Sequence, residues 1–175
     1  AIIVGISIYL LYGALDHLFI PVEQLSMVWA IRLSAVLFAV GVLVLTFSPW
    51  FEKINQIPLA LVGLVASLGL IAILWHLPAG GSAYYFPGLM LAAFYTYDLL
   101  GVRFILALAV NLLVLLLYNL LFGGLREYPQ AMLLSQNFFM VSANLIGGAA
   151  GYLVEYQRRK LFLRELQLDA ERRRH

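Results

Sequence analysis

The chain has 175 residues, of which 63% are hydrophobic and 11% are charged, and its mean hydropathy is +0.93. This composition leaves too little polar surface to cover a water-soluble globule, so it predicts an integral membrane protein. The net charge is only +2, and the lack of cysteine excludes disulfides, thiolate catalysis and cysteine-ligated metal sites.

Six apolar runs of about 17 to 25 residues follow one another, which is the length that crosses a bilayer as a helix. They cover residues 1–20, 27–47, 58–77, 84–100, 104–122 and a last run that begins near Gln130. The first run starts abruptly, so we expect a short polar leader before it. The link 48–56, with Trp50, has the amphipathic character of an interfacial loop. The predicted fold is all-α, a polytopic bundle of six transmembrane helices over residues 1–154.

Basic residues are concentrated at one end of the chain. Residues 155–174 hold seven of the eleven Lys and Arg. Six spans place both ends of the bundle on one side, and the positive-inside rule then predicts that the C-terminal tail is cytoplasmic. We expect a multi-pass membrane protein, surrounded by the lipid bilayer and without a nucleic-acid partner.

Polar and ionisable side chains recur near the outer ends of the predicted spans, where such groups are costly and often functional. The candidates for a ligand-binding pocket are Asp16, His17, Arg32, His76, Tyr84, Tyr85, Asn119, Gln136 and Asn137. Their common depth favours a small polar or metal-bearing ligand. The alternative is structural, with Asp16 paired to Arg32 and the tyrosines anchoring the helices at the interface.

The cofactor is left open by the sequence. His17 and His76 are candidate ligands for copper, zinc or haem, because imidazole suits all three. No catalytic residue is predicted, since the chain has no P-loop, no HExxH motif and no lysine within a span for a Schiff base. If the polar side chains bind a ligand, the chain would act as a sensor of that ligand. A small transporter and a passive membrane anchor are the alternative functions.

The last apolar run carries a stripe of small residues. Ala143, Gly147 and Gly151 repeat every four residues, a spacing that lets two helices approach closely in lipid. The stripe predicts either a parallel homodimer or packing against a neighbouring span of the same chain. Asn144 could donate a hydrogen bond across either interface.

Residues 155–175 are expected to continue the last span as a cytoplasmic coupling helix. One heptad stripe contains Val154, Leu161 and Leu168, and a second contains Leu163 and Leu166. Two overlapping registers predict a marginal coiled coil that a small free-energy change could switch. The alternative is a solvated helix or a basic segment lying on anionic lipid.

Two stretches, YYFPGLMLAAFYTYDLLGVRF at 84–104 and FFMVSANLIGGAAGYLVEYQRRKLFLRELQLDAERRRH at 138–175, resemble the six-helix membrane-associated sensor domain of bacterial nucleotide cyclases. That family includes class III adenylyl cyclases and diguanylate cyclases. The resemblance implies a sensor whose helix after Glu155 couples it to a catalytic dimer beyond His175. It implies no ligand-binding residue.

Overall fold

The computed structural model describes residues 1–78, 85–126 and 128–175, and every regular element in these ranges is helical. The elements are α1 (Ile2–Gly13), α2 (Asp16–Phe19), α3 (Val22–Leu45), α4 (Phe51–Ile54), α5 (Gln56–His76), α7 (Pro87–Phe94), η1 (Tyr95–Leu99), α8 (Phe104–Asn119), η2 (Leu120–Leu125) and α9 (Gln130–Arg174). The turns η1 and η2 are π-helical and continue α7 and α8.

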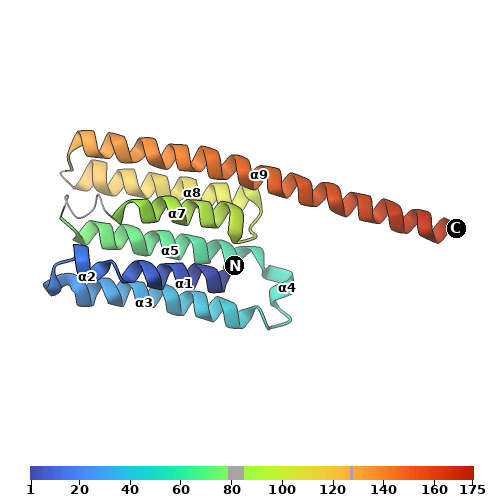
Figure 1. Cartoon of the computed structure of the whole chain (residues 1–175), viewed down its shortest axis with the longest axis horizontal. Coiled ribbons are helices and arrows are strands. Elements are labelled where there is room, and N and C mark those ends of the chain that lie inside the picture. The colour runs from blue at the N-terminus through green and yellow to red at the C-terminus, as the bar shows by residue number, and fades with distance from the viewer. Residues whose placement is uncertain (79–84, 127) are drawn as a thin grey trace.

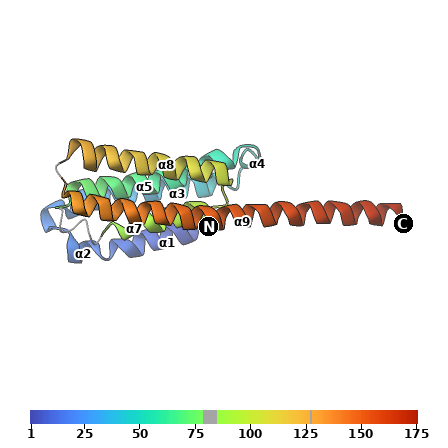
Figure 2. The same cartoon turned by 90° about the horizontal axis from the view of Figure 1, so that it is seen from above.

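The helices lie side by side in one elongated bundle (Figures 1 and 2). Helix α5 is central and packs against α3, α7 and α8. Helix α1 packs against α3 on one side, while α9 packs against α7, η1 and α8 on the other. We call the end of the bundle at which α2 lies the α2 end, and the opposite end, where α9 leaves its neighbours, the exit end (Figure 1).

Four helices are long and apolar enough to cross a membrane: Val22–Leu45, Gln56–His76, Phe104–Leu125 and Gln130–Arg174. These match the second, third, fifth and sixth predicted spans. The first and fourth predicted spans differ from the expectation. Residues 1–20 are divided into α1 and the short α2, and the run 84–100 begins its described helix at Pro87 and ends in the π-helical η1.

Proline sets several helix boundaries. Ile20 and Leu77 have extended backbones, and each of them precedes a proline, which disfavours the α conformation in the residue before it. Pro87 occupies the first turn of α7, where a missing N–H costs nothing. The expected interfacial link 48–56 contains the short helix α4, and Trp50 beside it is exposed.

Helix α9 runs without a break for 45 residues. Its first half packs in the bundle, and its second half extends alone past the exit end (Figure 1). The helix therefore remains continuous between Gly151 and Leu161, the stretch where a bend would have separated the bundle from the charged tail.

Candidate functional site

A buried ion pair joins α2 to α3 at the α2 end. Arg32 Nε and Nη2 donate to the two carboxylate oxygens of Asp16 at 3.1 and 2.9 Å, and both side chains are 0% exposed. Arg32 Nη1 donates to the backbone carbonyl of Tyr9 at 2.7 Å. This bidentate geometry satisfies both charges, which a buried pair needs if it is to offset the cost of desolvation.

The local sequence lets the guanidinium reach its partner. Helix α1 ends at Gly13, and two turn residues redirect the chain so that α2 begins at Asp16. A Cβ atom at Gly13 would lie 3.0 Å from Cδ and Nε of Arg32, so a larger residue here would require the Arg32 side chain to shift. Three aromatic rings have centroids 5.0 to 5.9 Å from Arg32 Cζ and add cation–π attraction: Tyr9, Tyr12 and Trp29.

Tyr85, two residues before α7, contacts the ion pair from a third part of the chain. Its hydroxyl donates to Asp16, and its ring packs edge-on against Tyr12 with the centroids 5.2 Å apart. Tyr85 is almost fully buried. Three predicted ligand residues, Asp16, Arg32 and Tyr85, are thus in contact with one another. Asp16 and Arg32 form the ion pair that we predicted as the structural alternative to a ligand-binding pocket. Ligand binding by these residues stays a prediction.

In the described part of the chain, neither histidine forms a hydrogen bond or ion pair with this cluster. His17 is exposed on α2, and His76 is half-buried at the last residue of α5. Within the described ranges, no group of three His, Cys, Asp or Glu side chains could hold a metal ion. Tyr84 falls outside the described residues. Ligation of copper, zinc or haem by the histidines stays a prediction.

Amide side chains connect α8 to α9. Asn119 Nδ2 donates to Asn137 Oδ1 at 2.7 Å. Gln136 accepts a hydrogen bond from the hydroxyl of Tyr118 and donates to that of Tyr128 at 3.3 Å. The predicted residues Asn119, Gln136 and Asn137 therefore form a link of their own, because their partners lie on α8, on α9 and in the connection before α9, and not on α2 or α3.

Aromatic packing bridges the ion pair and this amide link. Phe86 follows Tyr85 in the chain, and its ring centroid is 6.0 Å from that of Tyr118. Tyr118 in turn stacks on Phe122 at 4.8 Å. Phe86 and Phe122 carry no polar atom that would single them out in an apolar sequence. They nevertheless complete a line of buried rings from Asp16 to Gln136 on α9.

Arg126 is a structural side chain of the α2 end that the sequence placed only in a loop. Its guanidinium donates to backbone carbonyls of Leu74, Trp75 and Leu77, with Nη2 to Leu77 at 2.7 Å. Its Cζ also lies 5.6 Å from the Trp75 ring centroid. Arg126 thereby satisfies the Trp75 and Leu77 carbonyls at the end of α5, and its positive charge lies at the negative end of the helix dipole.

Replacing Arg126 by glutamine should destabilise the bundle by about 1.5 kcal/mol, the low end for hydrogen bonds to a charged group, because the side chain is half-buried. The measurement is the free energy of unfolding in mixed micelles. Arg126→Lys is the matched control and should recover part of the loss through its charge. Equal stability of Arg126→Gln and the unaltered chain would contradict the capping role.

The small-residue stripe of α9 packs within the chain. A Cβ at Gly147 would lie 3.1 Å from the Tyr97 ring, and one at Gly151 would lie 3.0 Å from the Tyr97 carbonyl oxygen. The Tyr97 hydroxyl donates to Asn144 Oδ1 at 2.9 Å, and Ala143 is 1% exposed. We call Tyr97, Asn144, Gly147 and Gly151 the α9 joint. The stripe therefore packs against a neighbouring helix of the same chain, which is the second of the two predicted arrangements. A homodimer stays a prediction, and it would have to use another surface of α9.

The predicted coupling residues past the bundle are exposed. The set comprises Val154, Leu161, Leu163, Leu166 and Leu168, whose exposed fractions range from 39% to 58%. Both heptad stripes therefore lie on the free half of α9. A partner helix could cover either of them, and the coiled coil stays a prediction.

Glu155 ties α9 to the beginning of α8. Its Oε2 accepts a hydrogen bond from the Phe104 N–H at 2.5 Å, and its Oε1 pairs with Arg159 one turn later. The Phe104 N–H, aided by the charges of Arg159 and Arg103, lowers the pKa of Glu155. Glu155 lies past the apolar part of α9, at the exit end, so this carboxylate caps α8 where the two helices separate.

Acid should loosen this connection. The pKa of Glu155 is lower in the folded chain than in the unfolded chain, where a glutamate has a pKa of about 4.3. The ionised carboxylate therefore stabilises the fold at pH values above the unfolded pKa. This stabilisation is lost as the pH falls through the folded pKa. Hydrogen exchange of the Phe104 amide, corrected for its intrinsic pH dependence, should accelerate in that range. In Glu155→Gln the exchange should be faster at neutral pH and lose this step. A step of unchanged size in Glu155→Gln would assign it to another group.

The comparisons with known proteins identify the family. The MASE8 family model matches residues 14–169, which is most of the chain. The chain belongs to the MASE8 family. MASE8 is a family of membrane-associated sensor domains, and the apolar helices of this chain accord with a membrane protein. No curated protein and no solved structure matches the chain significantly.

The MASE8 match covers the ion pair, the amide link, the α9 joint and the exposed leucines of α9, since Asp16 and Leu168 both fall within it. It therefore includes the free half of α9 and does not stop at the bundle. Helix α1 lies outside the match, so the Tyr9 carbonyl that receives Arg32 is not part of the MASE8 segment.

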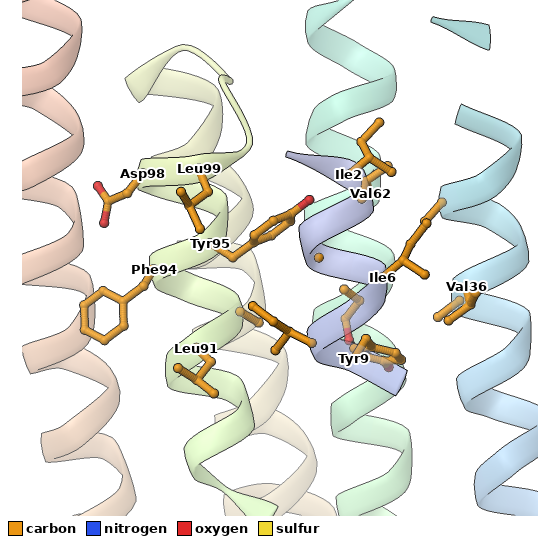
Figure 3. Close-up of a pocket in the computed structure, with 16 residues that line it drawn as sticks. Ile2, Ile6, Tyr9, Val36, Val62, Leu91, Phe94, Tyr95, Asp98 and Leu99 are labelled. Atoms are coloured by element: carbon orange, nitrogen blue, oxygen red, sulfur yellow. Dashed lines mark hydrogen bonds between the residues drawn. The ribbon is translucent and has the colours of Figure 1, made fainter. Parts of the chain in front are cut away.

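An apolar cavity of about 290 Å³ opens between α1, α3, α5 and the α7–η1 helix of this MASE8 domain (Figure 3). Ile2, Ile6 and Tyr9 form the α1 wall, and Leu91 and Tyr95 form the opposite one. The Asp98 side chain points away from this space (Figure 3). Asp16 and Arg32 do not line the cavity, although Tyr9 in its wall also contacts Arg32. The α1 wall precedes the MASE8 match.

Proposed function

We propose that this MASE8 chain senses a condition in or near the bilayer and transmits it through α9 to a cytoplasmic effector, a nucleotide cyclase that makes cyclic AMP or cyclic di-GMP. The observation that carries the proposal is the unbroken α9, which has its first half in the bundle and its second half free. A continuous helix transmits rotation or tilt because its backbone hydrogen bonds resist local bending. The resemblance to cyclase sensors supports this effector class.

In this proposal all six helical segments lie in the bilayer. Helices α1 and α7 with η1 are shorter than the other four but pack alongside them (Figure 1). The positive-inside rule orients the exit end toward the cytoplasm of a bacterial inner membrane, because most of the basic residues follow it. The α2 end then faces outward, and the site of sensing is near that end.

The path from the α2 end to α9 consists of packed side chains. A change at Asp16 or Arg32 would move Tyr85, and the rings from Phe86 to Tyr118 would pass that movement to Gln136 near the start of α9. At the other end, the α9 joint and Glu155 hold α9 against η1 and α8. A signal that alters these contacts would rotate or tilt the free half of α9.

Helical phase provides the test. A diguanylate cyclase catalytic domain is joined after His175. Between one and four alanines are then inserted between Arg164 and Glu165. Each inserted alanine rotates the downstream part of the helix and the catalytic domain by about 100°. Cyclase activity should be lowest with two alanines and recover with four, which restore the phase to within about 40°. Activity that falls steadily with insert length, or does not change, would contradict transmission through a rigid helix.

A second fusion separates a sensor from a passive anchor, the interpretation that competes with ours. Residues 1–154 are replaced by an unrelated dimeric membrane anchor in the same phase. Full activity with the same regulation in this chimera would favour the anchor.

Single cysteines at Leu161 and Leu163 address the predicted homodimer, because disulfide formation at either position requires two copies of α9 in parallel. A change in the ratio of the two yields under a stimulus would indicate a shift of register.

A further inference from the structure

A polar cavity lies at the exit end, where α9 leaves the bundle. Its volume is about 430 Å³, and its walls come from the turn after η1 on one side and from α9 on the other. The charged residues that line it are Asp98, Arg103, Glu155, Arg158 and Arg159. It therefore combines three guanidinium groups with two carboxylates at the point where α9 separates from its neighbours.

Part of this charge is already satisfied within the chain. Glu155 accepts from the Phe104 N–H and pairs with Arg159. In the described ranges, Arg103 and Arg158 form no ion pair, and one carboxylate oxygen of Asp98 is buried without a hydrogen-bond partner. That oxygen lies against Gly151, 3.5 Å from where a Cβ would be. The cavity thus holds two guanidinium groups without an ion pair, and the Asp98 carboxylate lines it with one oxygen that has no hydrogen-bond partner.

A second cavity of about 360 Å³ adjoins the first and shares Arg103, Glu155 and Arg159 with it. Its remaining walls are apolar or aromatic: Phe104, Ile105, Tyr152 and Tyr156. Ile105 and Tyr152 are 73% and 55% exposed on the side of the bundle. The two cavities together lead from a charged space to an apolar surface. A lipid has the matching order of parts, with a charged head group followed by an apolar acyl chain.

The depth of the cavities fits the same kind of molecule. Arg103 immediately precedes the apolar helix α8, and Glu155 begins the charged part of α9, so both mark the level at which apolar sequence ends. Lipid phosphates occupy that level, and basic residues next to a spanning helix are the groups that bind them.

We propose that this double cavity binds a glycerophospholipid whose head group carries a phosphate and a primary ammonium. The phosphate accepts from Arg103 and Arg158, the ammonium donates to Asp98, and an acyl chain lies along Ile105 and Tyr152. A bound lipid bridges the start of α8 to α9 and so holds α9 in its seat. The binding does not depend on the signalling proposed above, so either can fail without the other.

The test is native mass spectrometry of the 175-residue chain with bound lipid counted after release from mixed micelles. The micelles contain one dioleoyl lipid at a time: phosphatidylethanolamine, phosphatidylglycerol or phosphatidylcholine. The unaltered chain should retain phosphatidylethanolamine about tenfold more than phosphatidylcholine, whose quaternary ammonium has no N–H to donate. Asp98→Asn should abolish that preference, and Arg158→Gln should lower retention of all three lipids.

Arg164→Gln is the matched control, because it makes the same charge change on the free part of α9, outside the cavity, and should leave retention unaltered. Arg158 is exposed, so its substitution should not prevent folding. Equal retention of phosphatidylethanolamine and phosphatidylcholine, or no effect of Arg158→Gln, would overturn the proposal. Competition by inorganic phosphate or soluble phosphoethanolamine at concentrations equal to the lipid would assign the site to a free phosphate compound and also overturn it.

Discussion

Replacing Arg32 by methionine is expected to destabilise the bundle by about 3 to 5 kcal/mol, the cost of leaving one buried charge without its partner. Arg32 and Asp16 are both fully buried, and Arg32 also holds the Tyr9 carbonyl. The substitution keeps an unbranched chain of similar length and removes the charge. The free energy of unfolding, measured by denaturing detergent titration in micelles, reports the loss.

The double variant Asp16→Leu with Arg32→Met separates the effect of the unpaired buried charge from the effect of changed side-chain packing. It removes both charges, so it should be more stable than Arg32→Met alone. His17→Ala is the neighbouring control on α2, and an exposed side chain of this kind should change stability by less than about 0.5 kcal/mol. Additive losses in the double variant would show that the ion pair does not couple the two residues.

Replacing Gly151 by alanine should also have a large effect, measured against the same change at Gly148. A Cβ at Gly151 would lie 3.0 Å from the Tyr97 carbonyl oxygen, a backbone atom that cannot turn aside. A Cβ at Gly148 would meet its nearest atom at 3.7 Å, an ordinary contact. Overpacking costs about 1 to 3 kcal/mol, while both variants gain up to about 1 kcal/mol of helix propensity.

The two alanine variants should therefore differ by about 1 to 3 kcal/mol in the free energy of unfolding, with Gly148→Ala at or above the unaltered stability. Both residues lie on the same helix and gain the same methyl group, so the difference isolates the contact with η1. In the cyclase fusion, Gly151→Ala should also shift activity, because α9 is displaced from η1. Identical stabilities would mean that η1 yields at no cost and that the α9 joint is loose.

Much of the helical content followed from the sequence, and the reason is physical. Long apolar runs in a bilayer must satisfy their backbone groups internally, so runs such as 104–122 predict a helix whatever their neighbours are. Pro21 and Pro78 then indicate where helices end. The division of residues 1–20 after Gly13 was not predictable in the same way, since it depends on a contact between Asp16 and a residue of the following helix.

The site was predictable only in outline. Intramembrane Asp16 and Arg32 stood out because charge is costly there, and their opposite signs already suggested a pair. The separation of Asn119 and Asn137 from them was not evident, because depth along a helix says nothing about which helices are neighbours. Arg126 looked like a loop residue, since its backbone-carbonyl partners leave no trace in the sequence.

The length of α9 gives the fold a mechanical property. At 1.5 Å per residue, the 45-residue helix is about 68 Å long, and its portion past Glu155, the last residue tied to α8, is about 28 Å. If α9 tilted by about 10° about that residue, its far end would move sideways by about 5 Å, close to one helical pitch. In the proposed signalling, a small adjustment among the packed rings of the bundle would thus become a larger displacement at the far end of α9.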